Sequence, residues 1–201
     1  MPETTAHAKP HTIALSLIKK AALDETTHHA EDGPPPANWE IHDDLTTALN
    51  AWHAAGALHE ESLALVEWLA GELSAYLLQQ LGNQDRLQHW LRDFGDQVCH
   101  TQQHTHPAGP TAIDILSTVA INTATRPTRP LTANGLARIA APHLAYLRAG
   151  HEVEDAHELA LTLTLWAGTQ LSTITHYNAA NITAYVDARL AQLGDSADSG
   201  R

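Results

Sequence analysis

The 201-residue chain carries 23 acidic against 11 basic side chains, a formal net charge of −12, and 43% of its residues are hydrophobic. That apolar content supports a buried core and excludes wholesale disorder, and the negative charge argues against binding to a nucleic acid backbone, which requires clustered Lys and Arg. We expect a soluble, cytoplasmic protein: the N-terminus has no apolar signal segment, no apolar run reaches the ~18 residues of a membrane helix, and the single cysteine, Cys99, excludes an intrachain disulfide.

Helical periodicity dominates the first half of the chain, and no segment alternates like a β-strand. An acidic segment without Lys or Arg, Asp24 to Asp43, is expected to be a loop. Gly82 is expected to end the longest helix of this half, and Asn83 to cap the next one. The four expected helices are Pro10 to Leu23, one from near Asp43 to Gly56, Leu58 to Leu81, and one carrying Leu87, Trp90, Leu91, Phe94 and Val98.

The second half repeats this order of elements after a linker at residues 104–110. Thr111 with Asp114 resembles a capping box and predicts the start of a fifth helix. The expected sixth helix ends at Leu147 and kinks or restarts near Pro142. The last two expected helices are Glu152 to Tyr177 and Ala179 to Leu193.

An offset of 98 residues aligns the two halves. Between Ile41 and Asn83 it gives 12 identities in 43 positions, among them Trp68 with Trp166. We therefore predict an all-α bundle of eight helices built from two pseudo-repeated four-helix halves, residues 10–103 and 111–194, with disordered ends at 1–9 and 195–201. Two generic helical hairpins in a chain rich in Ala and Leu are the alternative explanation of the matches.

Histidines and glutamates recur at matched positions of the two halves. If the halves pack about a pseudo-twofold axis, two His and one carboxylate from each half suffice to ligate a divalent metal. The acids also suit the first turns of long helices, where the helix dipole favours negative charge, so a purely electrostatic role competes with the metal site. The candidate ligands are His53, His59, Glu60, His151, His157 and Glu158.

A second candidate metal site lies before the linker, because a thiolate and imidazoles at short spacing can bind Zn²⁺. Its residues are Cys99, His100, His104 and His106. This spacing is no established zinc pattern, and Pro107 and Gly109 favour a polar surface loop instead.

No constellation for nucleophilic catalysis and no phosphate-binding glycine loop is identifiable in the sequence. We therefore expect a non-enzymatic regulatory, adaptor or accessory module that binds another protein, with the acidic loop available to a basic partner. The alternative is a metal-dependent or small-molecule-binding helical enzyme that uses the His and Glu residues of the two long helices. A homo-oligomer is a third interpretation, and the sequence names no cofactor beyond a divalent metal.

Overall fold

The computed structural model of the protein describes residues 9–31, 38–101, 107–125 and 133–198, and all regular structure in these ranges is helical. The prediction of an all-α bundle is therefore confirmed. The described helices are α1 (Pro10–Glu31), α2 (Trp39–Ala54), α3 (Leu58–Leu81), α4 (Gln84–Thr101), α5 (Gly109–Thr125), α6 (Ala133–Tyr146), α7 (Glu152–Ile174) and α8 (Ala179–Asp198).

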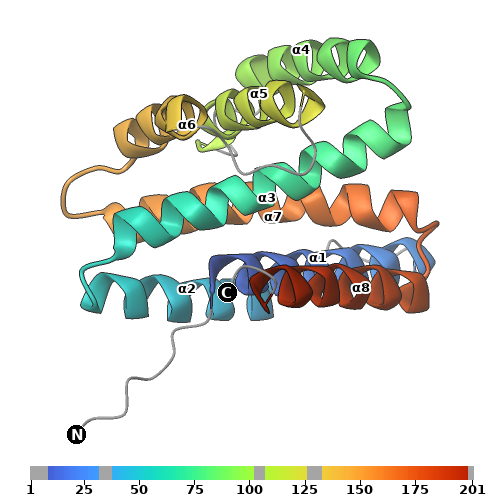
Figure 1. Ribbon diagram of the computed structural model, residues 1–201, viewed down its shortest axis with the longest axis horizontal. Coiled ribbons are helices and arrows are strands. Elements are labelled where there is room, and N and C mark those ends of the chain that lie inside the picture. Colours follow the sequence, from blue (N-terminus) through green and yellow to red (C-terminus); the bar gives the residue numbers. More distant parts are fainter. Residues whose placement is uncertain (1–8, 32–37, 102–106, 126–132, 199–201) are drawn as a thin grey trace, which may run out of the picture.

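The helices form three layers (Figure 1). α3 and α7 lie side by side in the middle and contact each other along their length. One outer layer holds α1, α2 and α8, and the other holds α4, α5 and α6. Each outer layer therefore combines helices from both halves of the sequence.

The middle layer supplies much of the hydrophobic core. Apolar residues recur every four positions on one face of α3, at Leu65, Leu69, Leu73 and Leu77, and all four are buried. α7 buries Leu159, Leu163 and Leu171 in the same way. Each fully buried leucine contributes roughly 1.5–3 kcal/mol relative to exposure, so the two-sided packing of this layer is the main source of stability.

α1 is longer than the sequence pattern predicts. The segment Asp24–Glu31, which we expected to be a loop, continues the helix, and α2 begins four residues before Asp43. The hydroxyls of Thr26 and Thr27 donate to the carbonyls of Ala22 and Leu23, at 2.8 and 3.0 Å. Both hydroxyls therefore have hydrogen-bond partners within the helix. This stretch is helical without an apolar stripe because most of its side chains need no burial.

Several predicted helix ends are confirmed. Gly82 adopts a left-handed conformation, with φ of 82°, immediately after α3. The Asn83 side chain accepts the backbone N–H of Arg86 at 2.9 Å, which caps α4. Gly56 and Gly150 also have positive φ and precede the two long helices.

Other predicted boundaries were wrong. The expected capping box at Thr111 lies inside α5, which already begins at Gly109. α6 continues through Pro142 without the restart that was the alternative to a kink, α7 ends at Ile174, and α8 extends to Asp198, past the predicted start of the tail. Residues 1–8, 32–37, 102–106, 126–132 and 199–201 lie outside the described residues. They include the middle of the predicted acidic loop, most of the predicted linker and the outermost ends. None of the described helices combines the length and apolar character that crossing a bilayer requires.

Candidate functional site

Part of the predicted histidine and glutamate set gathers where the end of α2 meets the starts of α3 and α7. His53 and His59 both lie near the carboxylate of Glu152, and all three are at the surface or partly exposed. The pKa of Glu152 is lowered first by backbone N–H groups, including that of Gly150, whose nitrogen lies 2.9 Å from Oε2, and then by the two histidines. This is an N-terminal helix-dipole arrangement strengthened by imidazoles.

The matched residues of α7 take different partners. His157 stacks on His42 of α2, with ring centroids 5.1 Å apart, and burial, followed by the neighbouring His42, lowers the pKa of His157. Glu158 accepts a hydrogen bond of 2.7 Å from the Tyr146 hydroxyl of α6. The set is therefore divided over separate contacts.

His151 and Glu60 are exposed at the first turns of α7 and α3. Nδ1 of His151 lies 3.5 Å from a carboxylate oxygen of Glu154 on the same helix. Within the described ranges, no group of three or more His, Cys, Asp or Glu side chains is arranged to hold a metal ion. The metal site of this set stays a prediction.

The second predicted metal site is only partly described. Cys99 is exposed near the end of α4, and Nδ1 of the exposed His100 lies 2.7 Å from the Asp96 carbonyl oxygen of its own helix. His104 and His106 lie outside the described residues, so this ligand set also stays a prediction.

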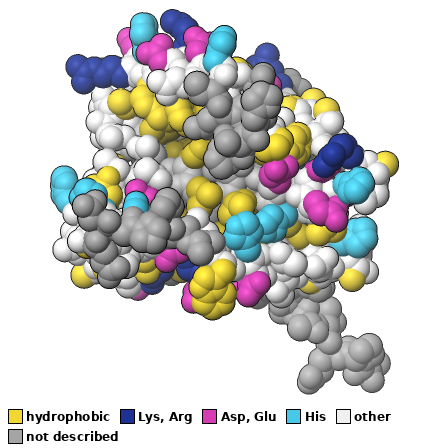
Figure 2. Space-filling view, turned by 180° about the vertical axis from the view of Figure 1, so that it is seen from behind, with side chains coloured by type: hydrophobic (Ala, Val, Ile, Leu, Met, Phe, Trp, Pro, Cys, Tyr) yellow, Lys and Arg dark blue, Asp and Glu magenta, His cyan; other side chains and the backbone are white. Residues whose placement is uncertain are grey.

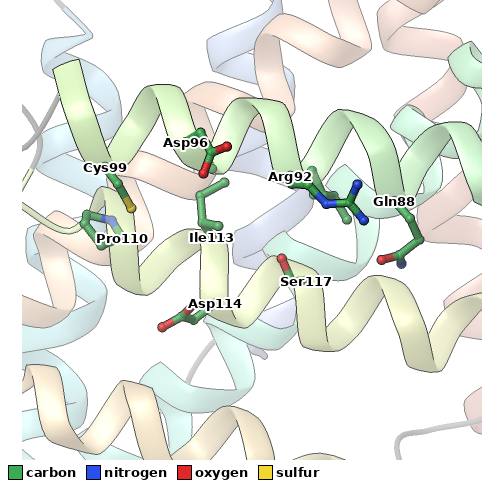
Figure 3. Close-up of a pocket in the computed structure, with 10 residues that line it drawn as sticks. Gln88, Arg92, Asp96, Cys99, Pro110, Ile113, Asp114 and Ser117 are labelled. Atoms are coloured by element: carbon green, nitrogen blue, oxygen red, sulfur yellow. The ribbon is translucent and has the colours of Figure 1, made fainter.

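An open groove of about 420 Å³ runs between α4 and α5 (Figure 3). Its floor includes Gly95 and Ile113, and a methyl group at position 95 would lie 3.2 Å from the Ile113 side chain, so the two helices approach closely here. The remaining lining residues are Gln88, Leu91, Arg92, Asp96, Cys99, Pro110, Asp114 and Ser117. The groove is not predictable from the sequence, because the facing of two antiparallel helices is a tertiary feature.

The outer surface of α5 and α6 exposes large hydrophobic side chains. The exposed fractions are 51% for Ile121, 36% for Leu136 and 48% for Leu144. Leu136 and Leu144 are eight residues apart, on one face of α6, and Ala137, Ala141 and Ala145 beside them are also exposed. The signal was present in the sequence: α6 has apolar residues on both its faces, whereas a surface helix normally has one polar face.

Figure 2 shows how charge is distributed over one face of the molecule. Acidic, basic and histidine side chains line its upper edge, where α4 lies in Figure 1, and hydrophobic side chains gather just below them. The outer face of α4 therefore presents charged and histidine side chains to solvent.

A buried polar pair joins α3 to α6. The Ser62 hydroxyl lies 3.2 Å from Nε2 of His143, and these residues are 1% and 0% exposed. Burial, with a smaller contribution from His59, lowers the pKa of His143 to about 4, so the ring is neutral at neutral pH. The pair was not predicted from the sequence, because its members are separated by 81 residues.

Comparisons of the chain with family models, with curated proteins and with solved structures find no match. The function is therefore inferred from the side chains and their arrangement.

Proposed function

We propose that this protein is a non-enzymatic helical module that binds another protein through the outer surface of α5 and α6. One observation carries the proposal. Among the residues whose side chains are described, four large hydrophobic residues are exposed, and three of them, Ile121, Leu136 and Leu144, lie on these two adjacent helices. Scattered exposed apolar residues are ordinary on a soluble protein, but three large ones on two helices that contact each other favour an interaction site there.

The opposite outer layer provides the contrast. Ion pairs link its helices to one another, with Lys19 of α1 on Asp187 of α8 at 3.2 Å and Lys20 on Asp44 of α2 at 2.7 Å. Among the side chains of this layer that the structure describes, Trp39, at 64% exposure, is the one exposed large hydrophobic residue. The proposed binding face is thus confined to one side of the molecule, the side that also has the α4–α5 groove.

A photo-crosslinking experiment in the native cell tests the proposal. A photoreactive residue at position 144 is expected to trap one discrete adduct, and the substitution Leu136→Glu should abolish it while circular dichroism shows the helices intact. The matched control places the same photoreactive residue at Trp39, the exposed hydrophobic of the opposite layer. Equal trapping at both positions, or none at either, would overturn the proposal, and an adduct with a second copy would establish the homo-oligomer instead.

We also propose that the two sequence halves arose by duplication. Most helix contacts support this, because they have a counterpart when each helix is replaced by the one four places along the chain; the contacts of α2 with α3 and of α3 with α4 have none of similar extent. α1 contacts α7 and α8 as α5 contacts α3 and α4, and α2 contacts α7 as α6 contacts α3. The halves are interleaved under this relation, with α3 and α7 next to the pseudo-twofold axis.

The enzyme alternative has its own test. Elemental analysis of protein purified without an affinity tag gives stoichiometric Fe, Mn or Zn if the His and Glu residues hold a metal.

We propose that the protein works in the cytoplasm. The exposed free thiol of Cys99 supports this location, because a free thiol fits a reducing environment.

A further inference from the structure

The buried contact between α6 and α3, called here the seat of α6, contains a polar pair, Ser62 and His143, where packing alone favours apolar side chains. Ser62 and His143 are almost completely buried and bonded to each other, and Nδ1 of His143 is buried without any hydrogen-bond partner. An unsatisfied buried polar atom costs free energy, so this seat is weaker than a hydrophobic one of the same shape.

The other half of the chain has the apolar version of this seat. At the offset of 98, His143 matches Leu45 of α2 and Ser62 matches Ala160 of α7. The glycines before the two long helices, Gly56 and Gly150, give an offset of 94 instead, which pairs His143 with Leu49 and Ser62 with Ala156. All four of these Leu and Ala residues are buried, so both registers place a hydrophobic pair where α6 has an ionisable one.

α6 is fastened firmly at its C-terminal end. Tyr146 donates to Glu158 of α7, and Arg148, just past the helix, forms an ion pair with the buried Asp155 of α7. His143 lies one turn before this anchor and follows Pro142, which lacks the backbone N–H of a normal helical residue. α6 can therefore swing about its C-terminal end if the contact of His143 with α3 is lost.

We propose that His143 is a pH-sensitive latch: its protonation releases α6 from α3 and uncovers the apolar faces that α3 and α5 turn toward it. Protonation gives the imidazole a second N–H and a positive charge, and Nδ1 then donates into a buried place that offers no acceptor. The latch does not depend on the proposed binding role, since it concerns the seat of α6 and not its outer face.

The charged surroundings of His143 favour this release. From α3, the facing titratable group is His59, whose proximity contributes to the lowered pKa of His143. α5 has a single ionisable side chain, Asp114, which lies in the groove against α4. On α6 itself, Arg138 is exposed five residues earlier, and the phenol of Tyr146 is engaged with Glu158.

The sign of the effect follows from the lowered pKa of the docked imidazole. The pKa is 6.5 for a free imidazole and about 4 for docked His143, so the released state binds the proton more tightly. Between these values the ratio of released to docked α6 rises by up to tenfold per pH unit, roughly 300-fold in all. Below pH 4 both states are protonated and the ratio changes no further.

Hydrogen exchange of the full chain tests the latch. Between pH 7.5 and pH 5.0, after correction for intrinsic exchange rates, we expect the protection of α6 amides to fall by about 30-fold more than that of α7. The double variant Ser62→Ala with His143→Leu, which copies the apolar pair of the other half, should lose this difference. The control His157→Gln, on α7, should keep it.

Two results would overturn the latch: α6 and α7 losing protection in parallel in the natural chain, or the double variant responding to pH as the natural chain does. If the double variant does not fold, proton NMR of the natural chain decides. The His143 imidazole is expected to titrate near pH 4, and titration near 6.5 without loss of α6 contacts would refute the proposal.

Discussion

Gly168 of α7 lies directly against the backbone of Ala21 in α1. A methyl group at position 168 would collide with the Ala21 side chain and lie 2.9 Å from its carbonyl carbon. The crossing of α7 over α1 is therefore possible only because residue 168 has no side chain.

We predict that Gly168→Ala lowers the free energy of unfolding by about 1–3 kcal/mol or more, because the colliding atoms belong to backbone that cannot rotate away. Gly71→Ala is the matched control: the other glycine of the two long helices has open space around its Cβ position. That substitution should raise stability by up to ~1 kcal/mol through helix propensity alone. Urea unfolding of both variants measures the difference, and a Gly168→Ala protein as stable as the natural chain would show that α1 and α7 are not so closely packed.

A second prediction concerns the buried carboxylate of Glu72, which accepts a hydrogen bond of 2.8 Å from Nε of Arg189 and thereby joins α3 to α8. Arg189→Met should cost ~2–3 kcal/mol, because it leaves a buried charge without its partner, while the arginine itself is partly exposed. Adding Glu72→Leu should recover part of the loss.

The exposed pair of Lys19 and Asp187 is the control for this experiment, since it also fastens α8. Lys19→Met should cost less than ~1 kcal/mol, as surface ion pairs generally do. Thermal melts in a double-mutant cycle measure the coupling of Glu72 and Arg189, and a coupling near zero would contradict a structural role for this pair.

A third prediction follows from the interleaved layers. α1 packs most extensively on α7, and α5 packs most extensively on α3, so each half of the chain completes its core with a helix of the other half. Residues 1–107 expressed by themselves should be largely unfolded or should dimerise, whereas co-expression with residues 108–201 should restore one folded complex. Circular dichroism and light scattering distinguish these states, and a folded monomer of residues 1–107 would contradict the interleaving.

The sequence predicted helix ends well where a local signal acts. Gly82 and Asn83 end one helix and cap the next through their own backbone and side-chain chemistry, which needs no tertiary partner. The end of α1 was missed because Asp24–Glu31 has no apolar stripe, and a polar helix of this kind looks like a loop to a method that relies on hydrophobic periodicity.

The register of the two halves is harder to read. The offset of 98 aligns Trp68 with Trp166, but these side chains contact different helices, His11 of α1 in the first case and Phe94 of α4 in the second. The glycines before α3 and α7 indicate 94, a shift of one helical turn. One turn leaves the same face of a helix toward the core, so hydrophobic patterning cannot distinguish the two registers.

Most features of the candidate sites could not be predicted from the sequence. The pairing of Ser62 with His143 and the facing of α4 and α5 arise from packing between distant segments. The matched histidines were correctly recognised as recurring, yet His59 and His157 occupy different surroundings, near Glu152 in the first case and on His42 in the second. Sequence repetition did not imply equal environments.

The last prediction concerns acid stability and the N-terminal turns of α7. The carboxylate of Asp155 is buried and accepts hydrogen bonds from Arg148 through its backbone N–H, at 2.7 Å, and through its guanidinium. Hydrogen bonding to the Arg148 side chain is the main reason that the pKa of Asp155 is lower than its usual value of 3.8.

A lowered carboxyl pKa stabilises the folded state above the unfolded pKa, and this contribution is lost as pH falls through the folded pKa. We therefore expect Asp155 to steepen the loss of stability below pH ~4, in a range where the His143 contribution has already ended. Asp155→Asn should lower the free energy of unfolding at pH 7 by ~1–3 kcal/mol and flatten its dependence on pH below ~4.

The control is Asp114→Asn, at an exposed carboxylate in the α4–α5 groove. It should change neither the free energy of unfolding at pH 7 nor the loss of that free energy below pH ~4 by more than ~0.5 kcal/mol. Urea unfolding at half-unit steps from pH 7 to pH 2.5 separates the two contributions, because Asp155→Asn changes the pH dependence of the free energy only below pH ~4, whereas His143→Leu changes it only above pH ~4. If Asp155→Asn left the acid limb unchanged, the ion pair with Arg148 would not hold the start of α7 in solution.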